Sequence, residues 1–214
     1  MMYIHKNIKI QRLGHDWFLI NYKWKNICID PFGLKEEFQA DYIFLTHNHR
    51  DHLSINDITK IIKSKTIIIC PLICEENLKE IQNKKIFLEQ NDNLDLDDFS
   101  VKTIPAYNID KFRSPWIQYH PKESGFVGFI FNFDWTTIYH AWDTDIISEM
   151  EWLSPDIAIL PVSWVYTMTA QEAVKSIELI KPQIAIPMHY DSIVWTTKDA
   201  QYFKEHANCE VVIL

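Results

Sequence analysis

Glycine is scarce in this sequence of 214 residues, which has only four: Gly14, Gly33, Gly125 and Gly128. Phosphate-binding loops need glycines at close, fixed spacing, so neither a G-x-G-x-x-G motif nor a P-loop can be formed from these positions. Cysteine is equally rare, and apart from one C-x3-C pair its four copies are scattered: Cys28, Cys70, Cys74 and Cys209. This spacing excludes a zinc ribbon or a disulfide framework and favours buried thiols in a reducing compartment.

Long apolar runs and a surplus of positive charge are also missing. No stretch approaches the roughly 18 apolar residues of a membrane span, and charges interrupt the N-terminal segment, unlike the apolar core of a signal peptide. The net charge of −8 and the pI near 5.5 argue against broad binding to a phosphate backbone. We therefore expect a cytoplasmic protein without nucleic-acid or membrane partners.

Short apolar runs of strand type alternate with helical segments along the whole chain. Strands are predicted at residues 8–13, 17–22, 26–29, 42–45, 66–70, 86–89, 99–104, 126–133, 136–140, 157–160, 183–187 and 210–214. Helices are predicted at residues 54–63, 72–82, 145–152, 170–180 and 197–206, and a long loop at residues 106–124. The length suits one domain over residues 1–214, and the order of elements suits an α/β domain with two sheets between helical layers.

The most informative segment is Thr46-His-Asn-His-Arg-Asp-His52, which directly follows an apolar strand. It places four metal-binding side chains within six residues: His47, His49, Asp51 and His52. Imidazole nitrogen together with carboxylate oxygen suits zinc, iron or manganese. Two histidines two apart in extended backbone point the same way and can bind one ion, so the segment predicts a metal site.

The sequence resembles the metallo-β-lactamase superfamily, whose H-x-H-x-D-H loop also follows a strand. More narrowly, it is similar to the small single-domain prokaryotic metal-dependent hydrolases of that superfamily, relatives of the ascorbate-6-phosphate lactonase type. Besides the loop, the resemblance rests on blocks in order along the chain: Leu13-Gly14-His15, Asp30-Pro31, Pro105-Ala106-Tyr107-Asn108, Tyr139 to Asp145, Tyr166 to Thr169 and Ile186 to Tyr190. It implies a four-layer αββα sandwich of the metallo-β-lactamase type.

The resemblance also implies a set of ligands for two divalent ions, zinc first, with manganese or iron as alternatives. His47 and His49 would bind metal 1, while Asp51, His52 and His189 would bind metal 2. Asp143 would bridge the two ions. The sequence itself supports the last two positions, because Asp143 and His189 each follow a predicted strand, and α/β folds place their sites at strand ends.

Metal 1 of the family usually has a third histidine, but the matching position here holds Asn108, a poor zinc ligand. His120, in the long loop, is the alternative; it can instead be a substrate contact or a plain loop residue. Three further roles are predicted: Asp51 orients the nucleophile besides binding metal 2, and Tyr190 or His15 steadies the oxyanion. His15 and His140 are also candidates for supporting the ligands.

Tryptophan replaces small residues at several positions of the family pattern. Trp142 stands where relatives carry Gly before the bridging Asp, and Trp164 and Trp195 lie beside other expected site loops. Either the turn at residue 142 has negative φ and tolerates the indole, or the pocket is remodelled. These three tryptophans are candidates for an aromatic pocket lining.

The predicted function is a metal-dependent hydrolase that uses a metal-bound hydroxide on a small ester, lactone or phosphoester. One alternative is a phosphodiesterase or nuclease with the same site. Another is a non-catalytic, metal-loaded binding protein with a tryptophan-narrowed pocket, and a di-iron redox site ranks last. The expected partner is a small-molecule substrate, with homo-oligomers as a possibility.

Overall fold

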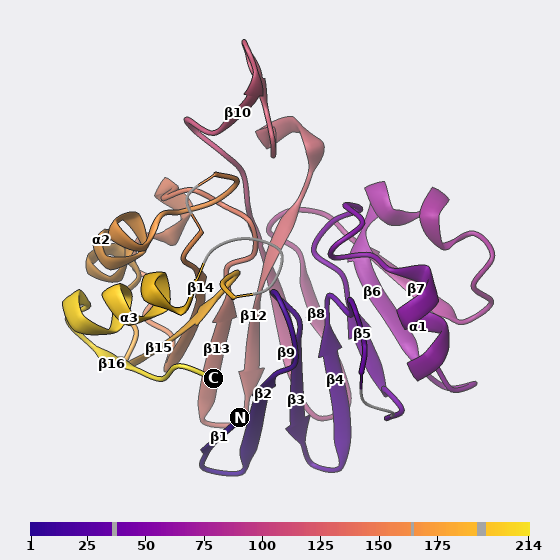
Figure 1. Ribbon diagram of the computed structural model, residues 1–214. Coiled ribbons are helices and arrows are strands. Elements are labelled where there is room, and N and C mark those ends of the chain that lie inside the picture. Colours follow the sequence, from indigo (N-terminus) through magenta and orange to yellow (C-terminus); the bar gives the residue numbers. More distant parts are fainter. Residues whose placement is uncertain (36–37, 164, 192–195) are drawn as a thin grey trace. The chain divides into compact units, whose positions relative to one another are not determined.

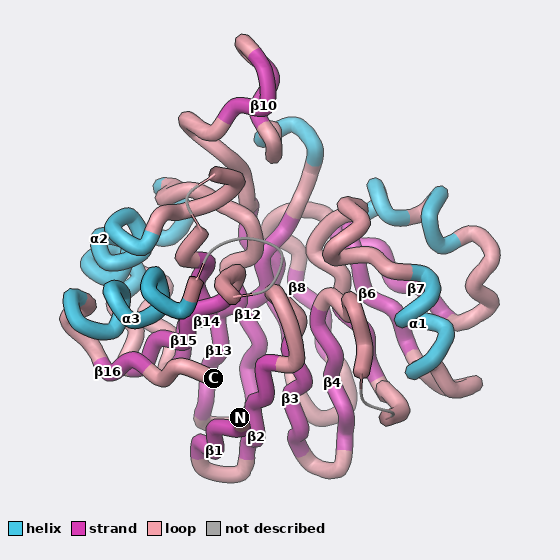
Figure 2. Tube along the Cα trace, in the orientation of Figure 1, coloured by secondary structure: helices cyan, strands magenta, loops and turns pink. Residues whose placement is uncertain are grey.

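The computed structural model describes residues 1–35, 38–163, 165–191 and 196–214, and these form two compact units. Unit 1 comprises residues 1–89 with Leu214, and unit 2 comprises residues 90–213. Each unit contains one seven-stranded sheet, and helices are few (Figures 1 and 2). The predicted α/β class is confirmed, while the assignment of residues 1–214 to a single domain stays a prediction.

The sheet of unit 1 runs in simple order from β1 to β7. Its first four strands form an antiparallel meander and the last three add in parallel: β1 (Met2–His5), β2 (Ile8–Arg12), β3 (Phe18–Tyr22), β4 (Lys25–Ile29), β5 (Tyr42–Phe44), β6 (Ile67–Pro71) and β7 (Lys84–Leu88). Parallel neighbours need crossover connections, and α1 (Ile55–Ile61) provides the one between β5 and β6. The apolar side of α1 packs in a cluster that includes Ile58, Ile61 and Ile43.

The sheet of unit 2 has the strand order β16-β15-β14-β13-β12-β9-β8. The strands are β8 (Asn93–Asp95), β9 (Ser100–Pro105), β12 (Val127–Phe133), β13 (Thr136–His140), β14 (Ile157–Pro161), β15 (Ile184–Met188) and β16 (Glu210–Val211). From β13 to β16 the strands are parallel, so their carboxyl ends lie at one edge of the sheet. The helices α2 (Ala170–Ile180) and α3 (Thr197–His206) pack beside these strands and share a core with them (Figure 1).

A small hairpin interrupts the predicted loop at residues 106–124. It consists of β10 (Phe112–Ser114) and β11 (Ile117–Gln118), and Figure 1 shows it extending away from the sheet of unit 2. Its turn is Pro115-Trp116, and the side chain of Trp116 is 94% exposed. A 3₁₀ turn, η3 (Lys122–Ser124), follows the hairpin.

Two helix predictions were wrong. Residues 72–82 form two 3₁₀ turns, η1 (Leu72–Cys74) and η2 (Glu76–Leu78), and residues 145–152 form only η4 (Ser148–Met150). None of these turns has a side-chain N-cap, whereas α1 and α2 are capped by Ser54 and Thr169. An apolar pattern without a cap is a weaker helix signal because the first backbone N–H groups stay unsatisfied.

Every helix in the described ranges is too short or too polar to cross a membrane.

Candidate metal centre

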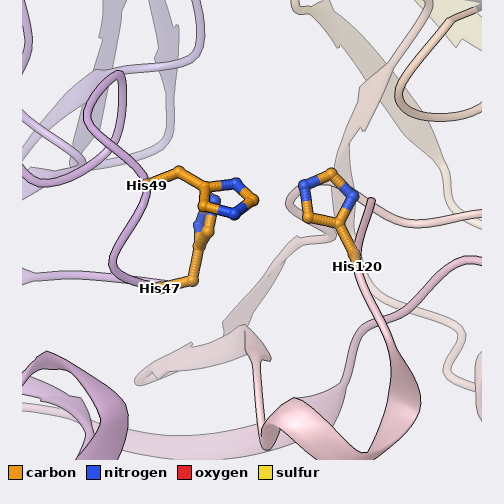
Figure 3. Close-up of side chains that lie close together, drawn as sticks. All are labelled: His47, His49 and His120. Carbon is orange, nitrogen blue, oxygen red and sulfur yellow. The ribbon is translucent and has the colours of Figure 1, made fainter. Parts of the chain in front are cut away.

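The histidine-rich loop of unit 1 follows β5 and closes in a tight turn. The backbone N–H groups of His52 and Leu53 both donate to the carbonyl of His49, at 3.0 and 2.8 Å. His47 lies before this turn and His49 begins it, and their ring centroids lie 4.4 Å apart. Figure 3 shows the two rings close together. Each ring offers a nitrogen within 4.8 Å of the other, so the predicted metal 1 pair is assembled.

Asp30, directly after β4, holds this loop in place through hydrogen bonds. Its side chain is fully buried and accepts three hydrogen bonds: from the Thr46 N–H at 2.9 Å, from Thr46 Oγ1 at 2.6 Å and from His52 Nδ1 at 2.9 Å. Its φ of +48° lies in the left-handed region, which Asp tolerates better than most residues. Asp30 therefore orients His52, as carboxylates commonly do for metal-binding histidines.

The same hydrogen bonds fix the tautomer of His47. Thr46 Oγ1 has one hydrogen, which it donates to Asp30. Toward His47 Nδ1, 3.2 Å away, Oγ1 must therefore act as acceptor, so the ring carries its hydrogen on Nδ1. This leaves the lone pair on Nε2, which is the form that binds a metal ion.

Asp16 is a member of this cluster that sequence reasoning missed. It is fully buried, and its Oδ2 lies 2.7 Å from Nε2 of His52, so both ring nitrogens of His52 face carboxylates. His15, Asp16 and Asp51 each offer a ligand atom within 4.8 Å of the others. The only hint in the sequence was an acid directly after the His15 block, a pattern without diagnostic spacing.

Asp51 differs from its neighbours because its side chain remains 32% exposed, while those of His52 and Asp16 are buried. Its Oδ2 lies 3.9 Å from Nε2 of His52. A carboxylate that is both near the cluster and open to solvent can contact a water or substrate directly. The role predicted for Asp51 stays a prediction.

Unit 2 brings three further predicted ligands together. Asp143 follows β13 and His189 follows β15, two strands on either side of β14 whose carboxyl ends share an edge. Asp143 Oδ1 lies 3.4 Å from Nε2 of His189, and its Oδ2 lies 3.7 Å from Nε2 of His120. All three side chains are buried, at 4% exposure or less.

Asn108 supports His120 rather than replacing it. Asn108 Oδ1 accepts from the backbone N–H of His120 at 2.9 Å and contacts Nδ1 of its ring at 3.0 Å. Its amide nitrogen donates to Asp145 Oδ1 and to the Tyr166 carbonyl, so the orientation of the amide is fixed by acceptors on one side and donors on the other. Nδ1 of His120 must therefore carry the hydrogen, which leaves Nε2 with its lone pair on the side of Asp143.

The carboxylate behind Asn108 is held in turn by the backbone. Asp145 accepts from the N–H groups of Ile109 and Asp110 at 2.7 and 3.1 Å. Burial raises the pKa of Asp145, although these two bonds and Lys111 act in the opposite direction. The Asp145 side chain thus connects the loop that carries Asp143 to the start of the 106–124 segment by hydrogen bonds.

Trp142 occupies the position before Asp143 with φ of +65° and no solvent exposure. The first alternative, a tolerated indole at negative φ, is therefore wrong. The indole packs edge-on against His120, at 4.9 Å between ring centroids, and against Phe126 at 5.2 Å. It fills the space behind His120, and the cost of a bulky residue in the left-handed region is of order 1–3 kcal/mol. Trp164 and Trp195, the other predicted pocket tryptophans, lie outside the described residues.

Tyr190 and His140 are buried in unit 2. Tyr190 is 2% exposed and belongs to the apolar cluster shared by α2, α3 and the sheet. His140 ends β13 with no exposure, and its carbonyl lies where a side chain on Gly128 would clash. The predicted catalytic role of Tyr190 stays a prediction.

Each unit therefore presents a compact cluster of imidazoles and carboxylates. In unit 1 it comprises His15, Asp16, His47, His49, Asp51 and His52; in unit 2 it comprises His120, Asp143 and His189. Nitrogen and carboxylate oxygen donors in this mixture fit zinc, iron or manganese. His47 and His120 hold the tautomer that leaves Nε2 able to coordinate.

Comparison with known proteins gives one consistent result. Residues 9–189 match the model of a beta-lactamase superfamily domain. A metal-dependent hydrolase from Archaeoglobus fulgidus is 33% identical, with 97% of this chain and 96% of the relative covered. One from Staphylothermus marinus is 35% identical, with 92% and 89% covered.

Solved structures agree with the sequence comparisons. A protein from Parabacteroides distasonis described as a metal-dependent hydrolase superposes with a TM-score of 0.83 at 29% identity, covering 100% of this chain and 96% of that one. A metallo-beta-lactamase fold protein from Bacillus subtilis has a TM-score of 0.73 at 14% identity, with 97% and 96% covered, and shows the fold alone.

Proposed function

The chain belongs to the beta-lactamase superfamily, and on that premise we propose that it is a metal-dependent hydrolase whose two clusters supply ligands to one dinuclear centre. The observation that carries the proposal is the donor set itself. Buried histidines whose Nδ1 is hydrogen-bonded and whose Nε2 keeps its lone pair occur in both units. Such support of the outer ring nitrogen is typical of metal ligands.

The ligand assignment follows the sequence prediction. His47, His49 and His120 would bind metal 1, while Asp51, His52 and His189 would bind metal 2. Asp143 would bridge the ions; it already contacts two histidines of this set. Zinc is the first choice, and manganese or iron suit the same donors.

Residues of the chain would orient the attacking water and stabilise the developing oxyanion. Divalent ions supply Lewis acidity and activate water for attack at neutral pH. Asp51, with its partly exposed carboxylate, orients the attacking water and accepts its proton. His15, in the same cluster, would donate a hydrogen bond to the developing oxyanion, and Tyr190 is the second candidate for that role.

The substrate we propose is a small ester, lactone or phosphoester. The net charge of −8 disfavours a polynucleotide substrate. Assays with a phosphodiester test the phosphodiesterase alternative. We further propose a cytoplasmic location and leave room for a homo-oligomer. No membrane partner is expected.

The decisive experiment is metal analysis by mass spectrometry on protein purified without added metal. About two ions per chain are expected for the wild type, and about one for either His49→Ala or His120→Ala. If both histidines bind the same ion, the double variant also keeps about one, because the second substitution removes nothing further. His206→Ala, an exposed histidine outside both clusters, is the matched control and should keep the wild-type content.

Activity is measured on the same preparations with an aryl ester, a lactone and bis-p-nitrophenyl phosphate. Ester or lactone turnover that is lost in Asp51→Ala supports the proposal, while preference for the phosphodiester favours the diesterase. Loss of both ions in the double variant would show two separate metal sites and refute the shared centre. A metal-free wild type would favour a binding protein.

A further inference from the structure

Two neighbouring hairpins in unit 1 frame a cavity that the proposed function does not use. The β1–β2 turn (Lys6-Asn7) and the β3–β4 turn (Lys23-Trp24) lie at the same end of the antiparallel meander (Figure 1, indigo). Between them is a cavity of about 540 Å³, within the range of small-molecule pockets. It belongs to unit 1 alone.

The cavity has a positive lining in an acidic protein. Three of its eight lining residues are lysines, Lys9, Lys23 and Lys25, and none is Asp or Glu, whereas the chain has 29 acidic and 21 basic residues. Asp41 is the acid that contacts this part of the sheet, through the Asn26 N–H, and it is already paired with Lys63 at 2.8 Å. The local charge therefore favours an anionic ligand.

Trp24 lies at one side of this cavity and is fully exposed. Its side chain is 101% exposed, and both turn residues, Lys23 and Trp24, have positive φ, of 43° and 66°. A two-residue hairpin turn of this kind normally carries Asn-Gly. The turn leaves the indole of Trp24 exposed beside the cavity, where its ring offers a stacking surface.

Two asparagines and a lysine lie side by side on the face of the sheet that lines the cavity. Lys9, Asn21 and Asn26 are directly opposite one another on β2, β3 and β4, so they share one face of the sheet. Asn21 donates to Asn26 Oδ1 at 2.7 Å, which fixes both side chains while using only one amide hydrogen of Asn21. Fixed amides of this kind read the polar edge of a ring or the hydroxyls of a sugar.

We propose that this cavity binds a free nucleotide, with the base stacked on Trp24, the phosphates bound by Lys9, and the amides contacting the base edge or ribose. A flat ring, a compact negative charge and several hydrogen-bonding groups are combined in that class of ligand. A polynucleotide needs an extended basic stripe, which a chain of net charge −8 does not favour.

The test is calorimetric titration of the full chain with ADP in EDTA, which removes metal-mediated binding. Trp24→Gly should weaken ADP binding by about tenfold to a hundredfold through loss of stacking, while thermal unfolding stays unchanged or moves to higher temperature because glycine suits the turn. A merely structural Trp24 would instead lower the unfolding temperature. Trp116→Gly is the matched control: it is also a hairpin-tip tryptophan, with φ of +68° and 94% exposure.

A second set of variants addresses the phosphates. Lys9→Gln should weaken ADP binding and reduce its salt dependence, whereas Lys102→Gln, at another exposed strand lysine, should change neither. Adenosine and ribose 5-phosphate, which each lack one half of the ligand, should both bind more weakly than ADP.

Three outcomes would overturn the proposal. They are absence of ADP binding at millimolar concentration, equal losses in Trp24→Gly and Trp116→Gly, and binding of a single-stranded oligonucleotide at least tenfold tighter than ADP. The last would assign the cavity to nucleic acid. None depends on the metal centre, because EDTA is present throughout.

Discussion

The clusters of the two units are supported in different ways. In unit 1, His52 lies between two fully buried carboxylates, at 2.9 Å from Asp30 and 2.7 Å from Asp16. In unit 2, Asp143 reaches His120 and His189 only at 3.7 and 3.4 Å, and the close contact to His120 comes from the amide of Asn108. Charge thus orients the histidine of unit 1, whereas a neutral amide orients that of unit 2. The first arrangement should matter more for folding and the second more for metal affinity.

The largest expected effect is that of Asp30→Ala in unit 1. It removes the acceptor of three buried hydrogen bonds and leaves Nδ1 of His52 without its carboxylate partner, so the free energy of unfolding should fall by about 3–5 kcal/mol. Urea unfolding followed by circular dichroism measures this loss.

Asp156→Ala in unit 2 is the matched control for that experiment. Asp156 also accepts three hydrogen bonds, from the backbone N–H and the hydroxyl of Thr137 and from the Gln183 amide, but it is only partly buried, just before β14. Its loss should cost about 1 kcal/mol. Equal losses in the two variants would contradict the view that the buried carboxylate dominates the stability of unit 1.

A smaller effect is expected from Asn108→Ala in unit 2, and it should appear in metal binding. Without the amide, His120 loses the acceptor for both its backbone N–H and its ring, so the affinity for metal 1 should fall by about tenfold to a hundredfold. Competition with a chelator measures it. Asn132→Ala, which removes a single strand-to-strand contact to Ser100, should leave affinity unchanged. An unchanged affinity in Asn108→Ala itself would remove His120 from the ligand set.

This difference between the units also explains what could be predicted from the sequence. The proposed ligands of unit 1 lie within six residues of one another, so one motif predicted His47, His49 and His52. Those of unit 2 come from a loop and two strand ends, and Asp143 and His189 were predicted from the resemblance to a family together with their positions after predicted strands. No local sequence pattern indicates Asp16 or the buried hydrogen bonds that His120 donates to Asn108, because three-dimensional packing alone creates them.

The starts of the helices also depend partly on tertiary contacts that the sequence does not indicate. The helix predicted to begin at residue 170 is confirmed, and a capping box starts it: Thr169 and Glu172 exchange both hydrogen bonds at the start of α2. At Ser54 only half of the box forms: Ser54 Oγ accepts from the Asp57 N–H, but the Asp57 carboxylate accepts from the N–H groups of Gly33 and Leu34. The Asp57 carboxylate thus bonds to a segment distant in sequence instead of to the backbone N–H of Ser54. The residues next to Asp57 do not indicate this contact.

The smallest effect concerns the surface contacts that hold the loop of His120. Lys122, two residues further on, donates to Tyr107 Oη and to Glu149, and the Tyr107 hydroxyl donates to Glu149 as well. Partial burial raises the pKa of Glu149, but the hydrogen bonds from Lys122, the backbone, Tyr107 and Ser148 outweigh it and lower the pKa from 4.5 to about 2. Because the folded state favours the ionised form, this group stabilises the fold above pH 4.5 and loses that contribution as the pH falls toward 2.

Glu149→Gln tests whether unit 2 depends on this exposed network. The wild type should unfold at higher urea concentration than the variant at pH 6, and the difference should shrink steadily as the pH falls from 4.5 toward 2, because protonation then removes the same charge from the wild type. The effect should be smaller than that of Asp30→Ala, since solvent screens the pair. A difference that stays constant down to pH 2 would mean that Glu149 acts through packing rather than charge, and the contrast between a charge-supported unit 1 and an amide-supported unit 2 would then extend to the loop of His120.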